Sequence, residues 1–136
     1  MSPRRAAPAE PPPEPTEAEL EILRVLWQQG ACTVRDVHAV LALHNPVAYT
    51  TVLTTLQIMH QKGLVKRDES ARAHVYTASL SQRRAQKRFL GKLLNRVFEG
   101  SATELVMQAL GTGKPATSEE LAKIRARLAE LEEQQK

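Results

Sequence analysis

The sequence predicts a mainly α-helical protein with a small β-hairpin, in which a winged helix-turn-helix domain is followed by a C-terminal helical dimerisation segment. Three observations predict this fold class. Capping patterns and apolar stripes indicate three helices between residues 16 and 62. Two runs of alternating polarity with a short polar link follow them, as in a hairpin. Three more amphipathic stretches follow, and they are too small to form a separate globular core.

The composition fits one small domain with an appended segment. The chain has 136 residues, of which 42% are hydrophobic and only 4% aromatic, so its core must consist mainly of Leu, Val, Ile and Ala. A single cysteine, Cys32, excludes an internal disulfide framework and fits a reducing compartment. No apolar run approaches the roughly 18 residues needed to span a membrane, and no secretory signal is recognisable. We therefore expect a cytoplasmic protein that does not insert into a membrane.

Positive charge is concentrated in the middle of the chain. The net charge is +4, but residues 1–59 carry 4 basic and 6 acidic side chains (−2), residues 60–100 carry 10 and 3 (+7), and residues 101–136 carry 5 and 6 (−1). A polyanionic partner is the leading explanation for this segregation. A solvated basic helix is the alternative.

The first fifteen residues differ in composition from the rest. Residues 1–15 are rich in Pro and Ala without periodicity, which predicts a disordered tail. A solubilising role is the simplest interpretation, and a Pro-rich ligand or a DNA-contacting arm through Arg4 and Arg5 are the alternatives. Residues 16–80 then make up the predicted winged-helix DNA-binding domain, and residues 81–136 the predicted helical dimerisation region.

Two capped helices open the predicted domain. Thr16 and Glu19 form a capping box before a helix that Gly30 ends. Thr33 opens a second helix in the same way, and the HNP sequence at 44–46 breaks it. Two short helices with a tight connection have helix-turn-helix geometry, although any small helical bundle offers such pairs.

The third helix, over about residues 47–62, has two unlike faces. At about 100° per residue, Tyr49, Val52 and Leu56 fall on one side, and mainly threonines and glutamines fall on the other. Threonine is a mediocre helix former, so its repeated use needs a reason. A helix in the DNA major groove supplies one, because short hydroxyl side chains bond phosphates or base edges and place a methyl group against thymine. An ordinary solvated face is the alternative.

A basic hairpin follows the third helix. The runs LVKR at 64–67 and RAHVYT at 72–77 alternate roughly with period two around a polar link. Three helices followed by such a hairpin make a winged helix, and this order of parts is more specific than any one part. We expect the hairpin tip, beside Arg67 and Arg72, to lie against phosphates or the minor groove.

Residues 81–132 are predicted to form three more helices. Ser81 caps the first, whose first turns are strongly basic although basic side chains there oppose the helix macrodipole, which suggests an external anion. SATE at 101–104 and TSEE at 117–120 read as capping boxes of the other two. We expect their apolar stripes to pair with a second copy of the chain, and packing back onto the winged helix is the alternative. The predicted dimerisation residues are Phe89, Leu90, Leu93, Leu94, Val97, Phe98, Leu105, Val106, Leu110, Leu121, Ile124 and Leu128.

Several segments resemble the penicillinase repressor and methicillin-resistance repressor family. The resemblance covers about residues 16–110 and, more loosely, the final helix. The segments are TEAELEILRVLW at 16–27, TVRDV at 33–37, AYTTVLTTL at 48–56 and KGLV at 62–65, with RAHVY at 72–76 fitting the family's wing and residues 93–101 its dimerisation segment.

The resemblance implies a homodimeric, nucleoid-associated winged-helix repressor that binds dyad operators in double-stranded DNA upstream of β-lactamase or other stress genes. In the best-known members, a membrane sensor with a cytoplasm-facing metalloprotease triggers cleavage in the dimerisation region, and the repressor leaves the DNA. Such a release is physically reasonable, since each half-site alone binds weakly. One branch of the family senses copper through C-terminal cysteine pairs, which are absent here. The Pro-rich N-terminal extension is also outside the usual pattern.

The predicted DNA-contacting residues come from the second helix, the third helix and the wing. Tyr49 leans toward the core in this interpretation, with its hydroxyl reaching a phosphate. A plain surface role is the alternative for each residue taken singly, but the set favours a DNA-reading surface. The set is Arg35, Tyr49, Thr50, Thr51, Thr54, Gln57, Arg67, Arg72 and His74, with Gln61 lower on the third helix.

Other functional classes have less support. Cys32, His38, His44 and His60 match no known metal-ligand motif, so we expect neither metal nor cofactor. No metalloprotease or nucleophile-elbow motif is present, so an enzyme is not predicted. The main rival is a winged helix that serves as a protein-interaction module, which would lack the steep salt dependence of DNA binding. A ligand- or metal-sensing regulator is a further alternative.

Overall fold

The computed structural model describes residues 14–136, so most of the predicted tail at 1–15 lies outside the described residues. The chain divides into two compact units that meet between Phe89 and Leu90. Helix α4 (Gln82–Arg96) spans this division. Residues 82–89 of this helix belong to the first unit, where Ala85 is only 3% exposed. The sequence placed the start of the dimerisation region at residue 81, and this boundary stays a prediction.

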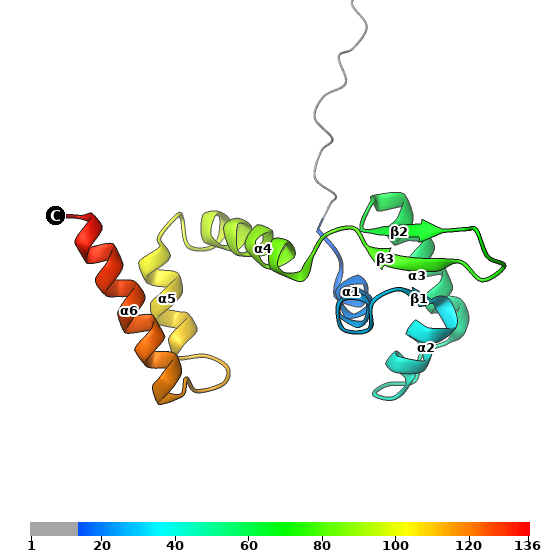
Figure 1. Ribbon diagram of the computed structural model, residues 1–136, viewed down its shortest axis with the longest axis horizontal. Coiled ribbons are helices and arrows are strands. Elements are labelled where there is room, and N and C mark those ends of the chain that lie inside the picture. Colours follow the sequence, from blue (N-terminus) through cyan, green and yellow to red (C-terminus); the bar gives the residue numbers. More distant parts are fainter. Residues whose placement is uncertain (1–13) are drawn as a thin grey trace, which may run out of the picture. The chain divides into compact units, whose positions relative to one another are not determined.

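The first unit is a winged helix, as predicted. Its helices are α1 (Glu17–Gln29), α2 (Val34–Ala42) and α3 (Tyr49–Lys62), and its strands are β1 (Cys32–Thr33), β2 (Val65–Asp68) and β3 (Val75–Ala78) (Figure 1). The strands form an antiparallel sheet in the order β1-β3-β2, in which Arg67 lies opposite Tyr76. The sequence predicted only the β2–β3 hairpin. Strand β1 was missed because two residues are too short to show a periodicity.

Local side-chain chemistry fixes where the first two helices begin. The Thr16 hydroxyl accepts the Glu19 backbone N–H while the Glu19 carboxylate accepts that of Thr16, and Thr33 and Asp36 make the same reciprocal pair. Both predicted capping boxes are therefore confirmed. Helix α3 begins at Tyr49, later than predicted, and its N-cap Ala48 makes no side-chain cap bond.

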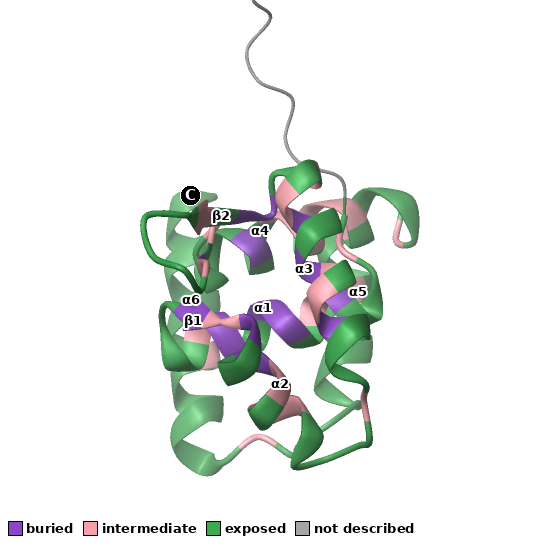
Figure 2. Ribbon diagram, turned by 90° about the vertical axis from the view of Figure 1, so that its right-hand side faces the viewer, coloured by how far each residue is buried: buried purple, intermediate pink, exposed green. Residues whose placement is uncertain are grey.

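One hydrophobic core joins the three helices to the sheet. Buried residues lie on α1, α2, α3 and the strands, whereas α6 carries none (Figure 2). Apart from Cys32, Met59 and Tyr76, the buried residues of this core are aliphatic, which fits the low aromatic content. Trp27 packs against its edge and donates its indole N–H to the backbone oxygen of Leu80 at 2.9 Å. This bond ties α1 to the segment that leads into α4.

The second unit consists of the rest of α4, α5 (Ala102–Leu110) and α6 (Ser118–Gln134). The predicted box at residues 117–120 is confirmed, but at 101–104 only half of one forms, in which Ser101 accepts the Glu104 N–H. No residue from 90 to 136 is buried. Large apolar side chains on the three helices and just after α4 are exposed, and they are Leu90, Leu93, Val97, Val106, Met107, Leu110, Leu121, Leu128 and Leu131.

Candidate nucleic-acid interface

The core determines which face of α3 is turned outward. Val52, Leu56 and Met59 are at most 1% exposed and anchor one side of the helix. At 100° per residue, the opposite side is centred on Thr50 and Thr54. The residues exposed on and around this outward face are Thr50, Thr54, Gln57, Ile58 and Gln61.

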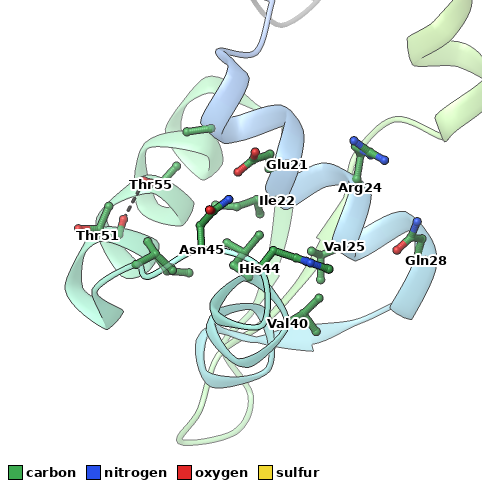
Figure 3. A pocket seen from close by; sticks show the side chains of 14 residues that line it. Glu21, Ile22, Arg24, Val25, Gln28, Val40, His44, Asn45, Thr51 and Thr55 are labelled. Atoms are coloured by element: carbon green, nitrogen blue, oxygen red, sulfur yellow. Dashed lines mark hydrogen bonds between the residues drawn. The ribbon is translucent and has the colours of Figure 1, made fainter. Parts of the chain in front are cut away.

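Thr51 lies on a different flank of α3 from the rest of the predicted set. It lines a hollow between α1, the α2–α3 turn and α3, together with Thr55, Glu21 and His44 (Figure 3). The Thr55 hydroxyl donates to the backbone oxygen of Thr51 at 2.7 Å, so it satisfies its hydrogen-bonding capacity within the helix. The four threonines of α3 therefore do not form one face, because successive helical residues are separated by about 100°.

Tyr49 does not lean into the core, contrary to the sequence-based expectation. It is 46% exposed and makes an edge-to-face contact with the His38 ring, with centroids 5.7 Å apart. The His38 Nε2 lies 2.8 Å from the backbone oxygen of Val47, which assigns the proton to Nε2. The helical wheel failed here because the first turn of α3 extends beyond the region that the core covers. The Tyr49 phenol is therefore accessible on the wing side of the domain.

A hollow on the wing side collects most of the predicted DNA-contacting residues. It is bounded by the start of α2, one flank of α3 and the wing, and Tyr76 lies at its base. This is a concave surface with three guanidinium groups, suited to an anionic ligand such as a phosphodiester backbone. The predicted residues that line it are Arg35, Tyr49, Gln57, Arg67, Arg72 and His74.

Arg67 is the most constrained cation of this hollow. A hydrogen bond to the Tyr76 hydroxyl, followed by the charge of Glu69, raises the pKa of Arg67 above its ordinary value, although partial desolvation opposes this. Its Nη2 lies 3.5 Å from Glu69 Oε1, and its Nε is buried without a hydrogen-bond partner in the described residues. The guanidinium therefore stays charged, and its hydrogen bond to Tyr76 and its contact with Glu69 hold it in place.

Glu69 was missed as a residue of the site. Its carboxylate contacts Arg67 and also lies 3.8 Å from His74 Nε2, so one acidic side chain faces two predicted phosphate contacts. The sequence signal was the DES run at 68–70, which indicates a turn but not which carboxylate returns to the basic strands. Asp68 is used differently: it accepts the Ser70 backbone N–H at 2.9 Å, and this bond lowers the pKa of Asp68.

Three other properties bear on the class of site. Within residues 14–136, no three His, Cys, Asp or Glu side chains are arranged to hold a metal ion. Cys32 is buried in β1, and its burial, followed by the charge of Asp36, raises the pKa of its thiol. None of the described helices is long and apolar enough to cross a membrane.

Comparisons with known proteins identify similar chains. The model of the penicillinase repressor family matches residues 15–130. The penicillinase repressor of Bacillus licheniformis is 24% identical over 98 residues, which cover 72% of this chain and 77% of that protein. The transcriptional regulator BlaI of Mycobacterium tuberculosis (strain H37Rv) is 39% identical over 61 residues, 44% of each chain. The same protein of strain CDC 1551 gives the same values.

Proposed function

The chain belongs to the penicillinase repressor family, and from this premise we propose that it represses transcription as a homodimer bound to a dyad operator in double-stranded DNA. The carrying observation is the wing-side hollow, in which Arg35, Arg67, Arg72 and His74 lie beside the exposed face of α3. Helix α3 would read bases in the major groove while the three arginines and His74 hold phosphates.

Base reading is assigned to the outward face of α3. Thr50 and Thr54 present short side chains that permit close approach, and Gln57 and Gln61 carry amides that can pair with adenine. Thr51 would reach the DNA from the other flank of α3 and would contact the sugar-phosphate backbone rather than a base edge. Tyr49 and Arg35 would contact phosphate at the rim of the wing-side hollow.

The homodimer is proposed from the exposure of the second unit. Residues 90–136 bury no side chain, yet they carry exposed leucines and valines on three helices. Exposed apolar surface of this extent is unfavourable in water, and a second copy would cover it symmetrically. Two linked winged helices would then engage the two halves of an operator.

Release from DNA is proposed to follow loss of this dimer. A membrane sensor metalloprotease pathway that responds to β-lactams or another stress, with cleavage in residues 81–136, would separate the two winged helices. Each half-site would then bind with its own low affinity, because the effective concentration supplied by the linkage disappears.

The deciding experiment is a binding titration of the full chain with the DNA upstream of its own gene and with a scrambled duplex, at two salt concentrations. We expect tight binding to a dyad element with two chains bound, and an affinity that falls steeply with salt. Weak binding without preference would contradict the proposal and favour a protein-interaction module instead.

A further inference from the structure

We infer that Glu69 is an internal competitor for DNA phosphate, which occupies the wing side chains Arg67 and His74 in the free protein and limits the affinity for every duplex. This inference rests on the proposed DNA-binding function. It assigns a role to a residue outside the predicted contact set, and it concerns the strength of binding rather than the choice of sequence.

The position of Glu69 carries the inference. Its Oε1 lies 3.5 Å from Arg67 Nη2 and 3.8 Å from His74 Nε2, and both partners line the wing-side hollow. A phosphate oxygen bound by the same two side chains would need the place that this carboxylate oxygen takes. Glu69 therefore stands in for the phosphate when DNA is absent, and keeps the two side chains directed toward one acceptor.

The contact is also suited to exchange. The Glu69 side chain is 56% exposed, and both distances exceed the 2.7–2.9 Å of a tight charge-assisted hydrogen bond. Asp68, its neighbour, is engaged by the Ser70 N–H and holds the turn of the wing. Glu69 can therefore swing away without disturbing the wing backbone, but its negative charge stays near the phosphate after it has been displaced.

The test compares the full chain with its Glu69→Gln and Glu132→Gln variants. Glu132 is an exposed carboxylate on α6, so its substitution changes the net charge equally without touching the wing. Dissociation constants are measured on operator and scrambled duplexes at one salt concentration, and thermal unfolding verifies that the fold is intact. A third variant, His74→Gln, is combined with Glu69→Gln in a double-mutant cycle.

We expect Glu69→Gln to tighten binding to both duplexes by about fivefold, the effect of removing one unit charge roughly 4 Å from a phosphate in water. The gain should be smaller in the His74→Gln background, and Glu132→Gln should change little. A gain no larger than that of Glu132→Gln would overturn this inference alone. If the unsubstituted chain binds neither duplex, the proposed function fails first.

Discussion

The Lys62 ammonium lies 2.9 Å from both carboxylate oxygens of Glu19, and this ion pair joins the end of α3 to the beginning of α1. The Glu19 side chain is only 4% exposed, and the same carboxylate accepts the Thr16 N–H that completes the α1 cap. One buried group thus completes the α1 cap and also holds the side chain of Lys62, the last residue of α3 before its C-cap Gly63. The helix proposed to enter the major groove is therefore tied to the helix that opens the domain.

Glu19→Gln should destabilise the winged helix by roughly 2 kcal/mol, because it weakens charge-assisted bonds while leaving an amide that can still complete the capping box. Urea unfolding followed by circular dichroism measures the change. Glu21→Gln is the control, because Glu21 is an exposed carboxylate two residues after Glu19 on α1. Equal stability of the two variants would show that the ion pair contributes nothing.

The stability of the winged helix should also fall between about pH 5 and pH 3, as the Glu19 carboxylate becomes protonated. Burial raises the pKa of Glu19, but the hydrogen bond from Lys62, the bonds with Thr16 and the Lys62 charge outweigh it, so the folded-state pKa is lowered. A lowered carboxylate pKa stabilises the fold above the unfolded value of about 4.3, and this contribution disappears as the pH falls through the folded-state pKa. Urea titrations from pH 7 to pH 3 should show a smaller loss for Glu19→Gln than for the unsubstituted chain. Parallel curves would refute this assignment.

Thr54→Ala should weaken operator binding by about tenfold and leave scrambled-duplex binding almost unchanged, since base-edge contacts are worth about 1–3 kcal/mol and exist only on the correct sequence. Arg72→Ala should weaken binding to both duplexes, since phosphates occur on every duplex. It should also reduce the slope of log affinity against log salt concentration by about one. Thr103→Ala, at an exposed position of α5, is a matched control. An equal loss on both duplexes for Thr54→Ala would argue against base reading.

Val97→Asp should convert the proposed dimer to a monomer. Val97 is 63% exposed just after α4, so a charge there costs the isolated chain little but would be desolvated in an interface. Analytical ultracentrifugation should show the mass halved, and operator affinity should drop by at least tenfold. Gln86→Glu adds the same charge at an exposed polar position of α4 and should preserve the mass. A dimeric Val97→Asp protein would place the interface elsewhere.

Features that depend on neighbours in the sequence were predictable. The boxes at Thr16, Thr33 and Thr117 follow from chemistry three residues apart, and the hairpin follows from its alternation. Strand β1 was not predictable, because its two residues acquire strand geometry only by pairing with Val75 and Tyr76. The capping pattern at Ser101 overestimated the bonding, since Glu104 supplies only its backbone N–H.

Sequence patterns suggested candidate residues for the DNA-binding site, but not how the structure arranges them around the wing-side hollow. The basic run and the threonine-rich helix indicated Arg67, Arg72 and Thr54 directly. Periodicity could not place Tyr49, which lies at a helix end outside the core. It also put Thr51 on the same face as Thr50 and Thr54, whereas in the structure Thr51 lines a different hollow. The contact of Glu69 with both strands of the wing depends on the turn between them, which no local pattern specifies.

The bond from the Trp27 indole to the Leu80 oxygen has a practical consequence. The chain contains one tryptophan, so all of its indole emission comes from the junction between α1 and the segment preceding α4. Intrinsic fluorescence is therefore a label-free spectroscopic reporter of that junction. A red shift of the emission on adding DNA, or on shortening the chain after α4, would record its opening without a dye or a further substitution.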